Sequence, residues 1–201
     1  MRFGVFYELQ MPKPWDAGSE HRIVHEALEQ VALADRLGFD YAWCVEHHFL
    51  EEYSHSPSPE SFLAAASQRT KQIRLGHGIM QLTTNHPARC AERVASLDLL
   101  SNGRCEFGMG ESASITELEP FGVDMENKRE IFEEAVWRGS SSIAATIRPW
   151  SAICASSRAA AAGRISPRRG SSPRGVTTAF VSLATRTAWT CVLPRTSGCR
   201  R

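Results

Sequence analysis

The segment YAWCVEHHF, residues 41–49, decides the fold of this chain. Its first five residues are apolar or aromatic, which is typical of a buried strand. One acid and two histidines follow directly, at positions 46–48. In parallel α/β folds, ligands and catalytic groups collect where the strands end. The segment therefore predicts a parallel α/β fold with a polar site at the end of this strand.

Strand-like and helix-like segments alternate on both sides of this segment. The hydrophobic spacing predicts strands over 3–7, 41–45, 73–80 and 104–109, and helices over 20–37, 59–68, 87–100 and 126–137. The resulting βαβαβαβα order indicates a parallel sheet with right-handed crossovers. A doubly wound sheet and half of a (β/α)8 barrel both fit, because a complete barrel typically needs about 250 residues. The spacing alone does not choose between them.

Charge is divided unevenly along the chain. Residues 1–137 hold 12 Lys and Arg against all 22 Asp and Glu, a net charge of −10. Residues 138–201 hold 11 Arg and no Lys, Asp or Glu, a net charge of +11. Such asymmetry marks two unlike parts. We therefore expect one folded part, 1–137, followed by a basic, low-complexity and disordered tail, 138–201.

The composition of the tail favours a shift of reading frame near codons 137–140. Residues 138–201 contain no Tyr, His, Gln, Asn, Lys, Asp or Glu, the seven amino acids whose codons carry A at the second position. In a G/C-rich gene, a one-base shift moves the G/C-rich third position into the second. The alternative is a natural basic tail that binds nucleic acid, which we do not favour because such tails usually carry Lys. Sequencing the DNA across these codons distinguishes the two.

The sequence also predicts a cytoplasmic protein. Met1 leads directly into a strand-like segment, so we expect no signal peptide. No apolar run approaches the ~18 residues of a membrane span. The six Cys show no CxxC pairing and fit reduced thiols.

Glu46, His47 and His48 are the first candidates for catalysis. A histidine can move protons near neutral pH, and a neighbouring carboxylate can fix its tautomer. The alternative is that one histidine is packed in the core and the other faces solvent. We expect no metal site, because three consecutive residues do not share a helical face and a cluster would need His77 and His86 as well.

Two glycine-containing segments are candidates for ligand binding. Gly76-His77-Gly78 lies in the third predicted strand, where glycine permits close approach of a ligand or forms a bulge. Gly108-Met109-Gly110-Glu111 follows the fourth strand, and its G-x-G spacing could admit a flat ring or a phosphate. A lone G-x-G is a weak signal.

Taken together, these segments resemble the luciferase-like, flavin-dependent monooxygenases. The resemblance covers residues 1–137 and rests on the order and spacing of several short motifs. These are Met1-Arg2-Phe3-Gly4-Val5-Phe6, Leu37-Gly38-Phe39-Asp40, Glu46-His47-His48-Phe49, Leu75-Gly76-His77-Gly78-Ile79, Asn85-His86-Pro87-Ala88-Arg89, Leu97–Arg104, Phe107-Gly108-Met109-Gly110 and Phe121-Gly122-Val123-Asp124.

The resemblance implies a TIM (β/α)8 barrel that binds reduced FMN at its C-terminal mouth and uses O2 to oxygenate a small molecule. A separate NAD(P)H-dependent flavin reductase would supply the reduced flavin. His47 would be the catalytic acid/base, with His48 as a second catalytic candidate and Glu46 in support. The Gly78–Ile79 bond would be a cis peptide against the flavin ring, and Gly110 and Glu111 would lie near the ring edge.

The resemblance also has limits. Luciferase itself carries a basic residue where Glu111 stands, and the phosphate-binding loops of the family belong to a second half whose pattern is absent after Trp137. We therefore expect a barrel truncated to about its first four βα units, with impaired activity. The alternatives are a non-catalytic half-barrel that needs a partner chain or dimerises, and an oxidoreductase that uses the deazaflavin F420.

Overall fold

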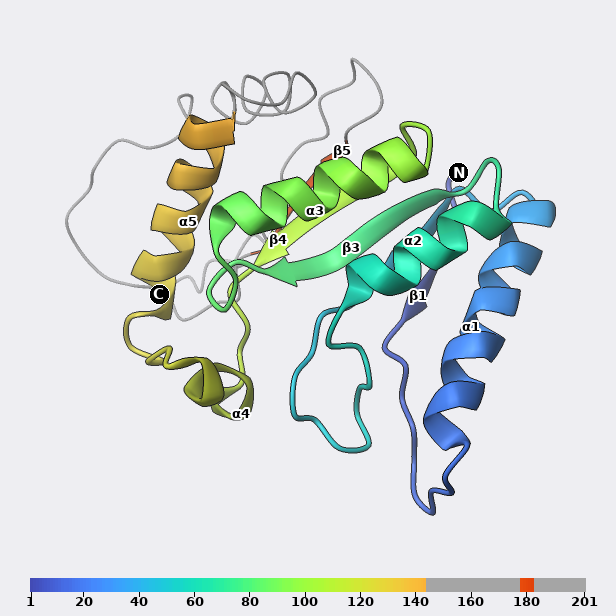
Figure 1. Ribbon diagram of the computed structural model, residues 1–201, viewed down its shortest axis with the longest axis horizontal. Coiled ribbons are helices and arrows are strands. Elements are labelled where there is room, and N and C mark those ends of the chain that lie inside the picture. The colour runs from blue at the N-terminus through green and yellow to red at the C-terminus, as the bar shows by residue number, and fades with distance from the viewer. Residues whose placement is uncertain (144–177, 183–201) are drawn as a thin grey trace, which may run out of the picture.

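Four consecutive parallel strands form the centre of the molecule. The structure is a computed structural model that describes residues 1–143 and 178–182 (Figure 1). The strands are β1 (Gly4–Tyr7), β2 (Tyr41–Cys44), β3 (Arg74–Gln81) and β4 (Cys105–Gly110), and each pairs with the next one along the chain. A doubly wound sheet places its first strand inside the sheet. The consecutive order is instead that of a barrel arc.

Helices connect the strands and pack on one another in sequence order. They are α1 (Ser19–Arg36), α2 (Pro59–Arg69), α3 (Pro87–Leu100) and α5 (Lys128–Ile143). Figure 1 shows α1, α2 and α3 side by side in front of the strands, and α5 packs against α3. Right-handed crossovers between neighbouring strands place successive helices on the same face. The predicted elements are all present, with ends shifted by a few residues.

Local sequence explains where several of these helices begin and end. Pro59 and Pro87 stand in the first turns of α2 and α3, where a missing N–H is tolerated. Gly38 follows α1 with φ +81°, and Gly103 follows α3 with φ +78°. Glycine reaches this left-handed region without steric cost, so it stops the helix. The short helices α4 (Ile115–Leu118) and η1 (Glu119–Phe121) were not predicted.

The two faces of the sheet differ in burial. The helix-covered face carries the core, in which alternate strand residues are buried: Tyr7, Ala42, Cys44, Leu75, Cys105 and Phe107. On the opposite face Phe6 is 56% exposed, and the ring of Trp43 lies over Gly76. A Cβ at Gly76 would come within 2.3 Å of that ring, so the position has room only for glycine. This second face corresponds to the inside of a barrel.

Part of the basic tail is described and forms a strand. Residues Thr178–Ser182 form β5, which pairs with β4 in the antiparallel direction. The fifth strand of a (β/α)8 barrel would be parallel to the fourth, so β5 does not continue the βα repeat. Helix α5 also extends past the predicted boundary to Ile143, so the expected disorder is wrong for 138–143 and for 178–182. Residues 144–177 and 183–201, and with them the rest of that expectation, lie outside the described residues. The frameshift remains a prediction.

Two further expectations can be compared with the described part of the chain. None of its helices is long and apolar enough to cross a membrane. Three of the six cysteines, Cys44, Cys90 and Cys105, lie in it as buried free thiols. Burial raises the pKa of Cys44 to about 12, so this thiol stays protonated near neutral pH.

Candidate active site

Polar residues that follow all four parallel strands meet at one edge of the sheet. Glu8 follows β1, Glu46 and His47 follow β2, Gln81 ends β3, and Glu111 follows β4. Beside them lies a pocket of about 350 Å³, lined by Val45, Glu46, His47, Leu50, Tyr53, Gly78, Ile79, Gln81, Gly110, Glu111, Ser112, Ala113, Ser114 and Glu117. The barrel-like order of the strands is what brings these loops together.

Six of the seven predicted site residues line this pocket. They are Glu46, His47, Gly78, Ile79, Gly110 and Glu111. The exception is His48, whose ring packs edge-on against Phe121 with the ring centres 4.9 Å apart. Its Nε2 lies 3.0 Å from Oε1 of Glu46. The side chain of His48 therefore meets the pocket through Glu46, and its backbone N–H meets it through Glu117.

His47 lies between two carboxylates. Its Nδ1 is 2.8 Å from Oε1 of Glu117, and its Nε2 is 3.5 Å from Oε2 of Glu8. Glu117 comes from α4, which is 70 residues further along the chain. A carboxylate at each ring nitrogen fixes the plane of the imidazole. The ring of Tyr53 packs edge-on against it, with the ring centres 5.4 Å apart.

The hydrogen bonds around Glu117 determine the tautomer of His47. Besides His47, the Glu117 carboxylate accepts from the backbone N–H of His48, from Nε2 of Gln81 and from Oγ of Ser112. Burial alone would raise the pKa of Glu117, but the hydrogen bonds from His47, Ser112 and the His48 N–H lower it to about 2. An ionised carboxylate can only accept hydrogen bonds. Nδ1 of His47 is thus the donor, and Nε2 is left for proton exchange.

Gln81 connects this pair to a second one, Glu46 and His48. Its backbone N–H donates to Oε2 of Glu46, and its side-chain Nε2 donates to the Glu46 carbonyl and to Glu117. Oε1 of Glu46 also accepts from Nδ2 of Asn85 at 2.7 Å. The two histidine–carboxylate pairs therefore belong to one buried network, in which a change at one member alters the others.

The residues that sequence reasoning missed are Glu117, Gln81 and Glu8. Ser114 and Glu117 have the S-x-x-E spacing of a helix capping box. In the structure Ser114 makes no side-chain cap bond, and Glu117 instead bonds His47. The only usable signal was an acid in a short segment after the fourth strand. Gln81 and Glu8 carried no signal beyond their places at the ends of strands.

The peptide bond between Gly78 and Ile79 is cis, as the family resemblance predicted. It lies in β3 at a point where the pairing with β4 shifts register, between His77 and Met80. Gly78 and Ile79 both line the pocket, and the side chain of Ile79 lies over Gly110. The glycine segments of β3 and β4 thus form one wall of the pocket.

His77 does not belong to this site. It is completely buried, and burial lowers its pKa to about 4, so the ring is neutral near pH 7. Its ring packs edge-on against Phe107. Within the described residues no group of three or more His, Cys, Asp or Glu side chains is arranged to hold a metal ion.

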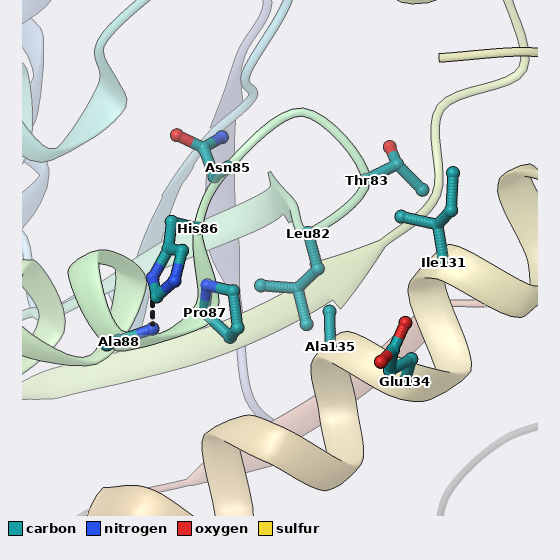
Figure 2. Close-up of a pocket in the computed structure, with 9 residues that line it drawn as sticks. All are labelled: Leu82, Thr83, Asn85, His86, Pro87, Ala88, Ile131, Glu134 and Ala135. Carbon is teal, nitrogen blue, oxygen red and sulfur yellow. Dashed lines mark hydrogen bonds between the residues drawn. The ribbon is translucent and has the colours of Figure 1, made fainter.

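A second hollow, of about 440 Å³, lies between the β3–α3 loop and α5 (Figure 2). Leu82, Ile131 and Ala135 face one another across it, and His86 turns back to accept a hydrogen bond from the N–H of Ala88. None of the predicted site residues lines it. Although this hollow is larger, the His47–Glu117 pair lines the first pocket and not this one.

Comparison with known proteins assigns the family. Residues 1–137 match the family described as luciferase-like monooxygenase. The chain belongs to that family. It is 42% identical over 135 residues to limonene 1,2-monooxygenase of Rhodococcus erythropolis, covering 66% of this chain and 33% of the relative. It is 32% identical over 131 residues to the alkanal monooxygenase alpha chain of the Kryptophanaron alfredi symbiont, covering 65% and 36%.

The fold agrees with this assignment. The crystal structure of monooxygenase RslO1 from Streptomyces bottropensis superposes with a TM-score of 0.64 at 35% identity, covering 70% of this chain and 42% of that one. The chain spans about a third of the length of the two curated relatives named above, the limonene and alkanal monooxygenases. The family match, residues 1–137, includes all four parallel strands.

Proposed function

We propose that the pocket beside His47 is the flavin-ring end of a monooxygenase site, in which reduced FMN and O2 oxygenate a small organic molecule. The observation that carries the proposal is the orientation of His47, held by the ionised Glu117 so that Nε2 is free to exchange a proton. The family membership of residues 1–137 supports the redox class. A separate NAD(P)H-dependent flavin reductase would supply the reduced cofactor in the cytoplasm.

The residues that line the pocket fit a flat heterocycle. The wall formed by Gly78, Ile79 and Gly110 carries little side-chain bulk, because two of its three residues are glycines. Val45 and Leu50 add apolar surface. Among the described residues, no Lys or Arg lines the pocket, so it suits the ring of FMN and not its phosphate.

His47 performs the proton chemistry in this proposal. With Nδ1–H held by Glu117, Nε2 accepts a proton from a group in the pocket and can return it in a later step. Glu8, 3.5 Å from Nε2, lies where it can hydrogen-bond to Nε2 once that atom is protonated. Glu46 and His48 position the β2 loop through Gln81 and are not assigned a contact with substrate. Bound reduced flavin would supply the electrons that activate O2.

Anaerobic titration of the full chain with reduced and oxidised FMN tests the proposal. We expect dissociation constants in the micromolar range, which corresponds to about −8 kcal/mol. The His47→Gln variant should still bind flavin, but its reaction with O2 should slow by about 100-fold or more, because one acid/base group is lost. The reaction is followed by the absorbance of the reoxidised flavin in a stopped-flow experiment.

His21→Gln is the matched control, since His21 is exposed on α1 and does not line the pocket. It should leave both the affinity and the rate of reoxidation unchanged. Binding of F420 in place of FMN would replace the cofactor in this proposal. Binding of neither would contradict the proposal and favour a half-barrel that needs a partner chain or a second copy.

A further inference from the structure

Two loops carry the side chains around the His47 imidazole. They follow β1 and β2 and leave the same end of the sheet (Figure 1). The N–H of His55 in the second loop donates to the carbonyl of Leu9 in the first at 3.0 Å. The N–H of Met11 donates to the carbonyl of Glu52, also at 3.0 Å. A movement of one loop relative to the other would break these bonds and leave backbone groups without partners.

Three consecutive residues of the β2 loop, Ser54, His55 and Ser56, determine where Glu8 and His47 lie. Oγ of Ser54 donates to the carbonyl of Glu8 at 2.6 Å. The carbonyl of Ser56 accepts from the N–H of His47 at 3.0 Å. The side chains of Glu8 and His47 approach each other to 3.5 Å. The backbone positions of both residues are therefore set by the short segment 54–56.

The His55 side chain fixes this segment to α1. Its Nδ1 is 2.8 Å from Oε1 of Glu20, in the first turn of α1, and its Nε2 is 2.5 Å from the carbonyl oxygen of Glu51. A carboxylate and a carbonyl only accept hydrogen bonds, so both ring nitrogens must donate. An imidazole donates from both nitrogens only as the protonated cation. His55 is therefore an imidazolium in this arrangement, and loss of its proton would remove one of the two bonds.

The groups in contact with the His55 ring are acceptors or aromatic. Besides Glu20 of α1 and the Glu51 carbonyl of its own loop, the ring of Trp15 in the β1 loop packs edge-on against it, with the ring centres 5.5 Å apart. Lys13 lies 5.0 Å from the Trp15 ring centre, and its ammonium pairs with the Glu51 carboxylate at 2.6 Å. The His55 side chain is 18% exposed, so its two bonds are largely shielded from water.

We propose that His55 is a positioning residue, whose protonated ring holds the segment 54–56 and thereby the arrangement of Glu8 and His47. This rests on the function proposed above. When the ring loses its proton, one of its two bonds is lost and the segment loosens, so Glu8 no longer meets Nε2 of His47 in the same geometry. His55 does not line the pocket. The reaction should thus depend on a proton that never enters the pocket.

The pH profile of flavin reoxidation tests this role. Stopped-flow traces of reduced FMN reacting with O2 are recorded for wild type and Glu20→Ala between about pH 5 and 8, where histidine changes its charge. At the acid end we expect wild type to react ~10-fold faster than Glu20→Ala, the effect of one charge-assisted hydrogen bond. At the basic end this ratio should approach one, because the neutral His55 of wild type has lost a bond as well.

Two further variants complete the kinetic test. Glu26→Ala removes the same charge from another exposed position of α1 and should follow wild type at every pH. In a His55→Gln background, Glu20→Ala should change the rate by less than ~2-fold, because two side chains that act through one bond are not additive.

Hydrogen exchange of the ligand-free chain separates this inference from the proposed function. The exchange rate of the His47 N–H reports how firmly the carbonyl of Ser56 holds it. At about pH 6, where the histidine cation is still populated, we expect Glu20→Ala to raise this rate by ~10-fold and Glu26→Ala to leave it unchanged. The N–H of Ile73, which is held by Asp35 near the opposite end of α1, should exchange at the wild-type rate in both variants.

The outcomes distinguish the two proposals. A ratio of wild type to Glu20→Ala that stays constant with pH, or exchange at His47 that Glu20→Ala leaves unchanged, would overturn the role of His55 and leave flavin binding intact. If the chain bound no flavin, the proposed function would fail and the exchange measurement would decide alone. Faster exchange at His47 with unchanged exchange at Ile73 would then still support the positioning role.

Discussion

Glu117 is the residue on which the geometry of the site depends most. Its carboxylate accepts hydrogen bonds from His47, the His48 N–H, Gln81 and Ser112. An ionised group that accepts several hydrogen bonds in a buried position keeps a low pKa, here about 2 compared with an ordinary 4.5. The same bonds hold the loop after β2 against α4, so the site and the local fold share one anchor.

The pH dependence of stability should reveal this anchor. A carboxyl group whose folded pKa is depressed contributes stability above its unfolded pKa and loses it as the pH falls toward the folded one. The contribution of Glu117 is therefore complete above about pH 4.5 and is lost toward about pH 2. Glu117→Gln should lower the free energy of unfolding at neutral pH by about 1–3 kcal/mol and flatten this acid-dependent fall.

Urea denaturation at a series of pH values measures both effects. Glu119→Gln, at an exposed position on η1, should change the free energy of unfolding by less than about 0.5 kcal/mol. If Glu117→Gln retained the acid dependence of wild type, the carboxylate would not be the ionised anchor described above.

At the scale of the elements, Asp35 joins α1 to the turn before β3. Its carboxylate accepts from the backbone N–H groups of Lys71, Gln72 and Ile73, at 2.9, 2.8 and 2.6 Å. Asp35→Ala leaves three N–H groups without their acceptor, of which only that of Ile73 is in a buried residue, and this should cost about 1–3 kcal/mol. Chemical denaturation of the full chain measures the loss.

Glu29→Ala is the control on the same helix. Glu29 pairs with Arg69 at the surface, and an exposed ion pair contributes only about 0–1 kcal/mol. An Asp35→Ala variant no less stable than Glu29→Ala would show that the turn is held by other contacts.

The elements were predictable from sequence because hydrophobic spacing and helix stop signals are local. Pro87 and Asn102-Gly103 mark the two ends of α3 in the sequence and in the structure. The order of the strands, in contrast, depends on contacts between residues far apart in the sequence. A doubly wound sheet and a half barrel both fitted the βα alternation. The structure shows that each parallel strand pairs with the next one along the chain, which is the order of a barrel arc.

The candidate site was only partly predictable for the same reason. Glu46 and His47 stand out because they follow a strand directly, and the resemblance added Gly78–Ile79. The His47–Glu117 bond spans 70 residues, and nothing in the sequence near either residue specifies its partner. His48 looked equivalent to His47 in sequence, but the alternation of the chain turns it toward Phe121.

At the scale of the whole molecule, the face of the sheet opposite the helices carries an exposed aromatic residue. Phe6 is 56% exposed there, in register with Trp43 of β2. Surface of this kind binds hydrophobic dyes and promotes association. We expect the full chain to bind anilinonaphthalene sulfonate at neutral pH, and Phe6→Ser to reduce the dye fluorescence while changing the free energy of unfolding by no more than about 1 kcal/mol.

Leu99→Ser is the control for this prediction, since Leu99 is 77% exposed on α3, on the other side of the sheet. It should leave the dye fluorescence close to that of wild type. Equal loss of fluorescence in the two variants would mean that the dye does not report on the sheet face. Sedimentation velocity on the same samples would show whether the aromatic face also drives self-association.

Strand β5 has a consequence for any attempt to complete the ring. It pairs with β4 from Glu106 to Gly110, on the side of β4 away from β3. The backbone groups on that side can bond one neighbour at a time. A separately expressed complementary half, offered in trans, would therefore compete with Thr178–Ser182 for the same row of donors and acceptors. Reconstitution would be a displacement reaction, with a rate set by the release of β5 as well as by the encounter of the two halves.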